Sequence, residues 1–468
     1  MGGFKIENGV RTDVVIVGGG LAGLAAGVAA SAKGASVLVL ERGTDERYRC
    51  NSRFAGGAFH VAYTDPQSPP ADLLAAIYRV TSGEVQPDLA SAIADNAGRA
   101  MHWLGDQGID FAPGPTAMHK WMLSPHRPML AGLDWPDHGP DKMMKTLGAR
   151  LVAAGGTFAR GCRALELRME NERCTGLRVQ RADAEIIDID ARAVLLADGG
   201  FQGNDEMVGR YISKRPEWLV QRSAGTANGD GIQMAVAAGA KLVSMERFYG
   251  HLLAREALTD DGFSPYPQID PVAAVAMVVD GTGRRFVDEG CGGINIANVV
   301  ARFDDPRTAF TLFDERIWRE GVGVTAVYPI NPTLERCGAT VFRAATPAAL
   351  AAQIGVDPQA LNETVETYNR ALREDKAETL TVPRSGSPAP LDANALMAVA
   401  MAVGITNTMG GIAIDAQMRV QRRGGGHIRA LYAAGGTTGG LEGGGTLGYV
   451  GGLIKALVTG LLAGENVL

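Results

Sequence analysis

The 468-residue chain has few cysteines, and their spacing suggests neither a disulfide framework nor a metal centre. The five cysteines are an odd number and include no Cys-x-x-Cys pair. Small disulfide-stapled domains and structural zinc sites carry paired or closely spaced cysteines. The sequence therefore predicts a fold that depends on its own core, with no metal.

Long apolar runs and basic tracts are also missing. A helix that crosses a bilayer needs about 20 apolar residues, whereas residues 14–32 are interrupted by glycines and follow Asp13. The net charge is −6, and no run of Lys and Arg is long enough to follow a phosphate backbone. We therefore expect no membrane insertion, no nucleic-acid partner and no signal peptide, and we take the cytoplasm as the expected location.

Glycine is abundant, and it gathers in short loops. The 62 glycines show no collagen-like period, and clustered glycines let a backbone approach a ligand closely. The first cluster, residues 18–23, follows an apolar run at residues 13–17 and precedes an Ala-rich run that reaches about residue 33. A second apolar run at residues 36–40 ends at Glu41. This order predicts a strand, a tight turn, a helix and a second strand.

The first cluster, Gly18-Gly-Gly20-Leu-Ala-Gly23, has the form GxGxxG. In a strand-turn-helix context its glycines permit the turn and let a pyrophosphate reach the helix N-terminus. Glu41, at the end of the second strand, is placed to accept hydrogen bonds from ribose hydroxyls. NAD and FAD use the same unit, so this motif alone does not choose between them.

The rest of the chain divides into regions of different pattern. Helical periodicity marks residues 88–108 and 140–154, and strand-like alternation marks 163–178 and 185–196. Residues 254–403 contain proline-rich loops and a helix-rich stretch at 345–373. Glycine loops then return, with a last helix expected from Leu447 to Leu462.

This pattern predicts an α/β fold with an α+β cap. A Rossmann-like FAD-binding domain would be built from residues 1–253 and 404–468, with a capping or catalytic domain at residues 254–403 inserted between them.

Six further motifs distinguish between NAD and FAD as the cofactor. They are Asn51-Ser-Arg-Phe-Ala-Gly-Gly57, Leu196-Ala-Asp-Gly-Gly-Phe201, Gly225-Thr-Ala-Asn-Gly-Asp-Gly231, Gly283-Arg-Arg-Phe-Val-Asp-Glu289, Thr408-Met-Gly-Gly411 and Leu431-Tyr-Ala-Ala-Gly-Gly436. With them, nearly the whole chain resembles the flavoproteins of the fumarate reductase and 3-ketosteroid Δ1-dehydrogenase superfamily. The resemblance implies FAD extended across the first domain and a cap that closes over the isoalloxazine ring.

The resemblance also implies which residues lie along the FAD. They are Gly18, Gly20, Leu21, Ala22, Gly23, Glu41, Arg42, Ser52, Arg53, Gly56, Gly57, Ala197, Gly199, Asp230, Gly435, Gly436, Thr446 and Leu447. Membrane-linked relatives attach FAD through a histidine, and the matching place near Cys50 has none. Non-covalent FAD is therefore expected, with Cys50 as the one conceivable attachment point.

The chain departs from the family pattern where a substrate would bind. Gly293 stands where fumarate reductases have a proton-donating arginine and ketosteroid enzymes a tyrosine, and Thr446 stands where a second arginine would bind fumarate. Asn407 replaces a histidine. A dicarboxylate needs paired guanidinium groups to offset its desolvation. The sequence therefore favours a neutral ketone or a monocarboxylate.

Four residues are considered as the acid or base of the reaction: Tyr266, His251, Glu442 and Tyr449. Arg53 is interpreted either as a carboxylate ligand or as half of a surface ion pair. Residues 119–127, which mix aromatic and cationic side chains, either line a pocket or form a plain loop.

The leading hypothesis is an FAD-dependent α,β-desaturase of a small carbonyl compound, such as a cyclic ketone or keto acid, with hydride passing to flavin N5 and an unknown electron acceptor. The alternatives are an enoate or enone reductase of the fumarate reductase type and a flavin-binding protein without turnover. A flavin hydroxylase is disfavoured because the chain has no second glycine fingerprint for NADPH.

Overall fold

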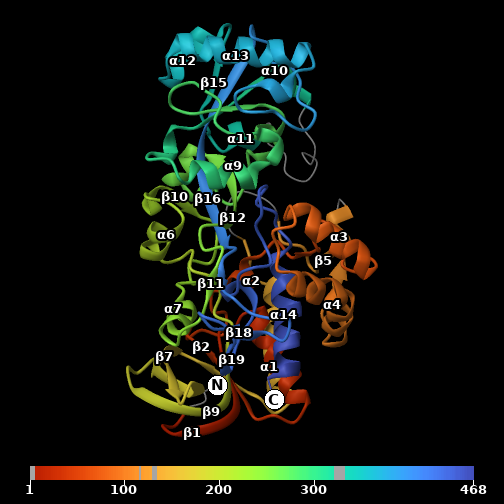
Figure 1. Cartoon of the computed structure of the whole chain (residues 1–468), viewed down its shortest axis with the longest axis vertical. Coiled ribbons are helices and arrows are strands. Elements are labelled where there is room, and N and C mark those ends of the chain that lie inside the picture. The colour runs from red at the N-terminus through yellow and green to blue at the C-terminus, as the bar shows by residue number, and fades with distance from the viewer. Residues whose placement is uncertain (1–5, 115–116, 129–133, 321–332, 468) are drawn as a thin grey trace.

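The computed structural model describes residues 6–114, 117–128, 134–320 and 333–467. Figure 1 shows an elongated molecule with two regions stacked along its long axis and both chain termini in the lower region. Among the described helices, none combines the length and the apolar composition that crossing a bilayer requires.

The lower region contains the predicted β-α-β unit. Strand β1 (Val10–Val17) pairs in parallel with β2 (Val37–Glu41), and helix α1 (Leu21–Ala32) connects them. The last four residues of β1 are buried, as a parallel strand covered on both faces requires. The expected strand, turn and helix are thus confirmed, and β1 begins three residues earlier than expected, at Val10.

The two strands of this unit belong to an eight-stranded sheet. Its order is β18-β19-β8-β9-β1-β2-β6, with β7 paired to β8. The segments with strand-like alternation, residues 163–178 and 185–196, form an antiparallel meander of β7 (Cys162–Glu170), β8 (Arg173–Arg181) and β9 (Ile186–Leu196). Its last strand, β9, then pairs in parallel with β1, which returns the chain to the nucleotide-binding unit.

Helix α14 (Gly452–Asn466), from the C-terminal part of the chain, packs against α1 and α4 (Pro87–Asp106). Figure 1 shows α14 beside α1, so the two ends of the chain share one core. The close approach depends on glycine, because a Cβ added at Gly460 or Gly464 would overlap the backbone of α1. Helix α5 (Gly139–Ala153) covers another side of α1.

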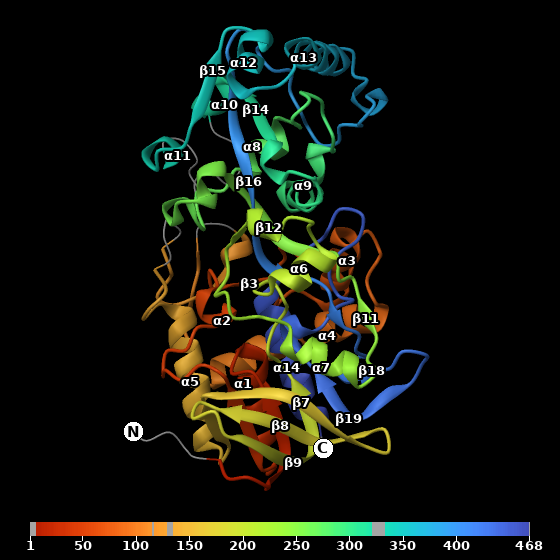
Figure 2. The ribbon, with the colours of Figure 1, turned by 90° about the vertical axis from the view of Figure 1, so that its left-hand side faces the viewer.

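The upper region is built on a six-stranded sheet centred on β16 (Leu396–Thr408). Its other strands are β10 (Leu219–Gln221), β12 (Phe248–Ala254), β13 (Met277–Val279), β14 (Phe310–Asp314) and β15 (Val341–Ala344). Figures 1 and 2 show β16 running from the upper region down toward the lower one. The helix-rich stretch is confirmed as α12 (Pro347–Ile354) and α13 (Pro358–Arg373).

The sheet of the upper region takes strands from both sides of the expected domain boundaries. Strands β10 and β12 begin before residue 254, and β16 continues past residue 403. The division of the chain at residues 253 and 403 remains a prediction about where the two units separate.

The remaining elements are short or connect the two regions. They are α2 (Asn51–Phe54), β3 (Ala58–Phe59), α3 (Pro70–Val80), β4 (Phe111–Ala112), β5 (Trp121–Leu123), β6 (Thr157–Arg160), α6 (Asp205–Tyr211), α7 (Asp230–Ala237), β11 (Leu242–Val243), α8 (Asp270–Val275), α9 (Gly293–Val300), α10 (Glu315–Glu320), α11 (Thr333–Arg336), β17 (Gly411–Ile412), β18 (Arg419–Gln421) and β19 (His427–Ala433).

The start of the last helix was predicted wrongly. Helix α14 begins at Gly452, not at Leu447. Leu447 has a positive φ of 49°, which a right-handed helix does not contain. The backbones of Gly443 and Gly448 bridge each other instead, so the predicted first turn is a small loop.

Candidate active site

Two cavities meet where the upper region lies over the lower one. The first follows the β1–α1 turn and ends at the start of α14, and the second lies beneath the upper region. They share the wall formed by Phe54, Ala55, Gly56, Met118, Arg222, Tyr249, Tyr266, Thr406 and Tyr449. A molecule in the first cavity can therefore touch a molecule in the second.

The three glycines of the first motif have different physical roles. Gly18 has a φ of +105°, and an added Cβ there would lie 2.5 Å from the Ala197 carbonyl oxygen. A Cβ at Gly23 would overlap the carbonyl oxygen of Gly18. At Gly20, by contrast, the nearest atom is Ser52 Oγ at 3.6 Å, so this position faces the open cavity.

The N-terminus of α1 is free to bind an anion. Its N-cap, Gly20, contributes no side-chain cap, and the first turn has no acidic residue. Ser52 Oγ accepts the Leu21 N–H at 3.0 Å from across the cavity. Helix N-termini of this kind bind phosphate through free N–H groups and the helix dipole.

Glu41 lies at the wall of the first cavity, where the family resemblance puts a ribose ligand. Its two carboxylate oxygens accept the N–H groups of Gly19 at 3.0 Å and Gly43 at 2.7 Å. Burial raises the pKa of Glu41 above its usual range. Its carboxylate is thus fixed in place and still has lone pairs to accept hydroxyl groups.

Asp198 closes the same end of the cavity and was not among the residues predicted to bind the cofactor. It accepts the Gly231 N–H at 2.7 Å, and burial raises its pKa to about 6. Asp230, which was predicted, also lines the cavity and forms an ion pair with Arg163 at 3.0 Å.

The opposite end of the first cavity lies at the start of α14. Here Glu442 accepts the backbone N–H groups of Val450 at 3.2 Å and Gly451 at 3.4 Å, and its other oxygen lies 3.3 Å from Lys455 Nζ. Lys455 also donates to the Thr438 carbonyl at 2.9 Å. Both oxygens of Glu442 are therefore engaged, which favours a structural role over that of a base.

Most residues predicted to lie along FAD do line the first cavity. They are Gly18, Gly20, Leu21, Ala22, Glu41, Arg42, Ser52, Gly56, Gly57, Ala197, Gly199, Asp230 and Gly436. Gly23 serves helix–strand packing, and Gly435 packs against Ala22 and donates to Thr459. Thr446 and Leu447 line the second cavity instead of the first, because the loop before α14 carries them there.

Arg53 matches neither of its two interpretations. Its side chain is buried and forms an ion pair with Asp141, which is fully buried in α5. The pair joins α2 to α5. The Arg53 guanidinium therefore lies behind the cavity wall and does not line the first cavity.

A cofactor of the size of FAD fits this arrangement. At one end, the first cavity offers a glycine cradle, the N-terminus of α1 and Glu41. At the other end lies the N-terminus of α14, and neither helix has a capping side chain at its N-cap glycine. Glu41 suits the ribose of the adenosine, the glycine cradle and the N-terminus of α1 suit the pyrophosphate, and the N-terminus of α14 suits the isoalloxazine. Residues from both ends of the chain contribute to it.

We expect FAD to be bound without a covalent link. Cys50 lines the first cavity, but burial raises the pKa of its thiol to about 12, so it is a poor nucleophile at neutral pH. The purified protein should carry about one FAD per chain, and acid precipitation should release it into the supernatant. Yellow colour retained in the precipitate would contradict this prediction and would identify Cys50 as the attachment site.

The second cavity contains a hydrogen-bonded chain of three side chains. Asp270 Oδ1 lies 3.1 Å from His251 Nδ1, and His251 Nε2 lies 2.9 Å from the Tyr249 hydroxyl. The Tyr249 ring stacks on Tyr449 with 3.7 Å between the ring centroids. All four line the second cavity, and both tyrosines also line the first.

Arg222 is a cation at the wall between the two cavities. It donates to Thr406 Oγ1 at 2.6 Å and to the Pro265 carbonyl at 3.1 Å, whereas its buried Nε has no partner among the described residues. Arg127 lines the second cavity and donates to the Phe54 carbonyl at 2.6 Å. Residues 118, 119 and 127 all line a cavity, so this region is more than a plain loop.

The sequence interpretation found His251, Tyr266 and Tyr449 but missed Tyr249, Asp270 and Arg222. One signal was available: Tyr249 and His251 lie two residues apart on β12, and alternate residues of a strand share a face. No local pattern marks Asp270 or Arg222, which reach the cavity from other elements.

Comparisons with known proteins agree with this geometry. Residues 13–448 match the family model described as "FAD binding domain". The chain is 28% identical over 81% of its length to an NADH:acrylate oxidoreductase of Vibrio harveyi and 26% identical over 97% to an NADH:fumarate oxidoreductase of Klebsiella pneumoniae. It spans 37% and 47% of those two proteins, less than half of each.

Solved structures show the same fold. A 3-ketosteroid Δ4-(5α)-dehydrogenase from Rhodococcus jostii superposes with a TM-score of 0.73 at 21% identity, covering 98% of this chain and 97% of that one. A flavocytochrome c3 fumarate reductase gives a TM-score of 0.68 at 22% identity, covering 98% and 78%. The chain therefore belongs to the FAD binding domain family.

Proposed function

We propose that this protein dehydrogenates the Cα–Cβ bond next to a carbonyl group in a small ketone or keto acid. The observation that carries the proposal is the shared wall, where Arg222, Tyr249 and Tyr266 face both cavities. A carbonyl anchor and proton-transferring groups thus lie beside the end of the cofactor cavity. FAD, when bound, supplies the acceptor for the β-hydride at its N5 atom.

The residues of the chain supply the other half of the reaction. The Arg222 guanidinium is placed to hold a carbonyl oxygen and to stabilise the negative charge that develops on it as the α-proton leaves. The proton passes to a phenol or imidazole at the wall, for which Tyr266 and His251 are the residues predicted from sequence. Tyr449 stacks on Tyr249, and its hydroxyl oxygen accepts the Gly452 N–H at 2.6 Å, at the start of α14.

A single carbonyl or carboxylate fits the second cavity better than a dicarboxylate does. Neither Gly293 nor Thr446 supplies a guanidinium, and Thr446 uses its hydroxyl to donate to the Val80 carbonyl at 3.0 Å. Arg127 is engaged with the backbone of α2. We therefore expect succinate to reduce the flavin, and fumarate to reoxidise it, far more slowly than a matched monocarbonyl compound does. Rapid turnover of either dicarboxylate would show that Arg127 and Arg222 act as a pair.

The reverse reaction, reduction of an enoate or enone, is the second candidate. It is favoured by the names of the relatives, which include reductases of acrylate and fumarate. Location in the cytoplasm is also proposed, and the five free cysteines support a reducing compartment.

Anaerobic flavin spectroscopy tests the function and its direction. A saturated ketone such as cyclohexanone or 1-decalone should bleach the oxidised flavin if the protein is a dehydrogenase. If it is a reductase, cyclohexenone or acrylate should restore the colour of the dithionite-reduced flavin instead. A flavin that none of these compounds changes would favour a binding protein without turnover and would contradict the proposal.

A further inference from the structure

We infer that Asp270, His251 and Tyr249 form a proton relay in which the Tyr249 hydroxyl takes the α-proton from the substrate. This inference rests on the proposed function and assigns its proton-accepting group. It differs from the sequence prediction, which named Tyr266 or His251 and did not include Tyr249 or Asp270.

The hydrogen bonds set the direction of the relay. Asp270 Oδ2 accepts the Leu252 N–H at 3.0 Å, so this carboxylate is held as an acceptor. Its Oδ1, 3.1 Å from His251 Nδ1, then selects the imidazole tautomer that carries hydrogen on Nδ1. His251 Nε2 is left as an acceptor for the Tyr249 hydroxyl hydrogen at 2.9 Å. The remaining lone pair of the Tyr249 oxygen is free to receive a proton.

The charges and phenols around His251 are consistent with a neutral imidazole at rest. Burial lowers the pKa of His251, Asp270 opposes that shift, and Arg222 adds to it. Tyr249 is surrounded by the phenols of Tyr63, Tyr266 and Tyr449, and burial raises its pKa well above the usual value. A buried phenol of this kind needs a base beside it before it can accept a proton.

Gly293 is the feature that makes room for Asp270. A Cβ at residue 293 would overlap the Asp270 carboxylate, so any side chain there would displace it. Gly293, which stands where the relatives have an arginine or a tyrosine, is therefore the residue that leaves room for the Asp270 carboxylate. Cys291 and Gly293 both line the second cavity.

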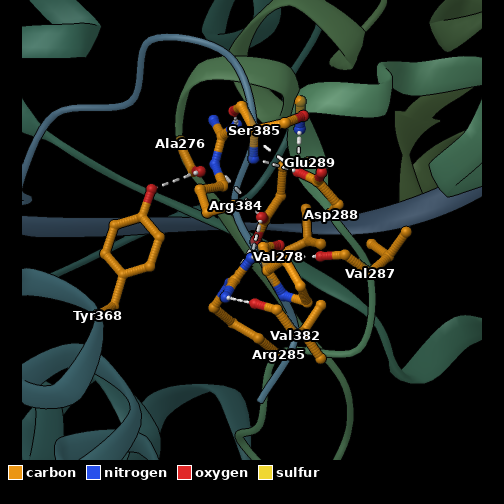
Figure 3. A network of polar contacts seen from close by, with 12 residues as sticks. Ala276, Val278, Arg285, Val287, Asp288, Glu289, Tyr368, Val382, Arg384 and Ser385 are labelled. Atoms are coloured by element: carbon orange, nitrogen blue, oxygen red, sulfur yellow. Dashed lines mark hydrogen bonds and ion pairs between the residues drawn. The ribbon is translucent and has the colours of Figure 1, made fainter. Parts of the chain in front are cut away.

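A polar network, buried at Glu289 and Arg384 and partly exposed at Asp288, holds the loop that precedes Gly293. Asp288 Oδ1 accepts the N–H groups of Gly290 and Ser385, both at 2.9 Å, and Glu289 binds Arg285 and lies 3.4 Å from Arg384. Figure 3 shows these side chains pointing toward one another. The network fixes the backbone against which Asp270 packs.

The proposed step is balanced with FAD as the oxidant. The α C–H bond breaks and its proton passes to the Tyr249 oxygen, while the phenolic proton moves to His251 Nε2. The β-hydrogen leaves with its electron pair as hydride to FAD, and a C=C bond forms in the product. The imidazolium is stabilised by the Asp270 carboxylate until the proton is released.

The test uses the full-length holoenzyme with the variants Tyr249→Phe, His251→Asn and Asp270→Asn. The matched controls, Tyr211→Phe, His102→Asn and Asp304→Asn, change the same residue types outside both cavities. Cyclohexanone and 1-decalone are the probes, and anaerobic flavin reduction is followed from pH 6 to about 10, a window that covers the ordinary His and Tyr pKa values. FAD occupancy and thermal unfolding establish that each variant is folded.

We expect Tyr249→Phe and His251→Asn to slow flavin reduction by about 10²–10⁴-fold, as loss of a positioned base does. Asp270→Asn should slow it less and should shift the pH profile, because only the tautomer and the imidazolium lose support. The controls should match the wild type. Reduction at the wild-type rate by Tyr249→Phe would overturn the relay, and Tyr266→Phe then identifies the alternative group.

A second readout needs no substrate. Nitrogen NMR of the protein labelled at its seven histidines, assigned through His251→Asn, reports which imidazole nitrogen carries hydrogen. We expect hydrogen on Nδ1 of His251 in the wild type and a changed tautomer in Asp270→Asn. Hydrogen on Nε2 in the wild type would overturn the relay. If no probe reduces the flavin, the proposed function is wrong. The NMR measurement of the His251 tautomer still tests the relay in that case.

Discussion

Gly20→Val is expected to give a folded protein that binds no FAD, whereas Gly23→Val should fail to fold stably. At Gly20 the only atom near an added Cβ is Ser52 Oγ at 3.6 Å, so a valine points into the first cavity and fills the pyrophosphate site. At Gly23 the Cβ overlaps the Gly18 carbonyl, which belongs to the backbone and cannot turn aside. Overpacking of this kind costs about 1–3 kcal/mol or more.

The two variants are compared by FAD content, circular dichroism and thermal unfolding. Gly105→Ala is the matched control, because this glycine also lies in a helix, α4, and nothing lies within 4 Å of its added Cβ. It should keep both FAD and stability. Normal FAD content in Gly20→Val would contradict the placement of the pyrophosphate.

Glu289→Leu should destabilise the upper region more than any exposed substitution does. The Glu289 carboxylate is fully buried and receives Arg285 Nε at 2.9 Å, Arg285 Nη2 at 2.6 Å and the Val278 N–H at 3.0 Å. Arg384 lies against it with its side chain 1% exposed. Figure 3 shows the two arginines converging on this one carboxylate.

Removing the carboxylate leaves the buried Arg285 guanidinium without this counter-charge and leaves Arg384 with only Asp288, 3.9 Å away. Breaking a buried ion pair from one side costs about 3–5 kcal/mol, so we expect a marked fall in the unfolding temperature of the holoenzyme. Asp304→Asn removes an exposed pair with Lys214 and should change it little. Unfolding of Glu289→Leu at the wild-type temperature would show that the arginines find other partners.

The cofactor side of the molecule could be predicted because its signals are local. The strand at residues 13–17, the GxGxxG turn and Glu41 lie within 30 residues of one another and form one β-α-β unit. Thirteen of the eighteen residues predicted to bind FAD line the first cavity, and six of them, from Gly18 to Arg42, belong to this unit or directly follow it. The start of α14 was misplaced because an apolar, glycine-rich sequence does not reveal that Leu447 has a positive φ.

The substrate side could be predicted only in part, because its contacts are long-range. The relay depends on β12 pairing with β16, which brings Tyr249 and His251 beneath the upper region. Asp270 joins from α8, 19 residues farther along, and Arg222 from the segment after β10. Gly293 was interpreted as a missing functional group, and the structure shows that its lack of a side chain admits Asp270.

Reduction of the flavin by a saturated ketone decides whether the protein is a dehydrogenase. The purified holoenzyme is mixed anaerobically with a saturated cyclic ketone, and flavin absorbance and products are followed together. We expect the flavin to bleach with one molecule of α,β-unsaturated ketone formed per FAD, and we expect both changes to be greatly slowed in Tyr249→Phe. An unchanged flavin with every saturated carbonyl compound, together with rapid reoxidation of the reduced flavin by an enone or enoate, would contradict this expectation.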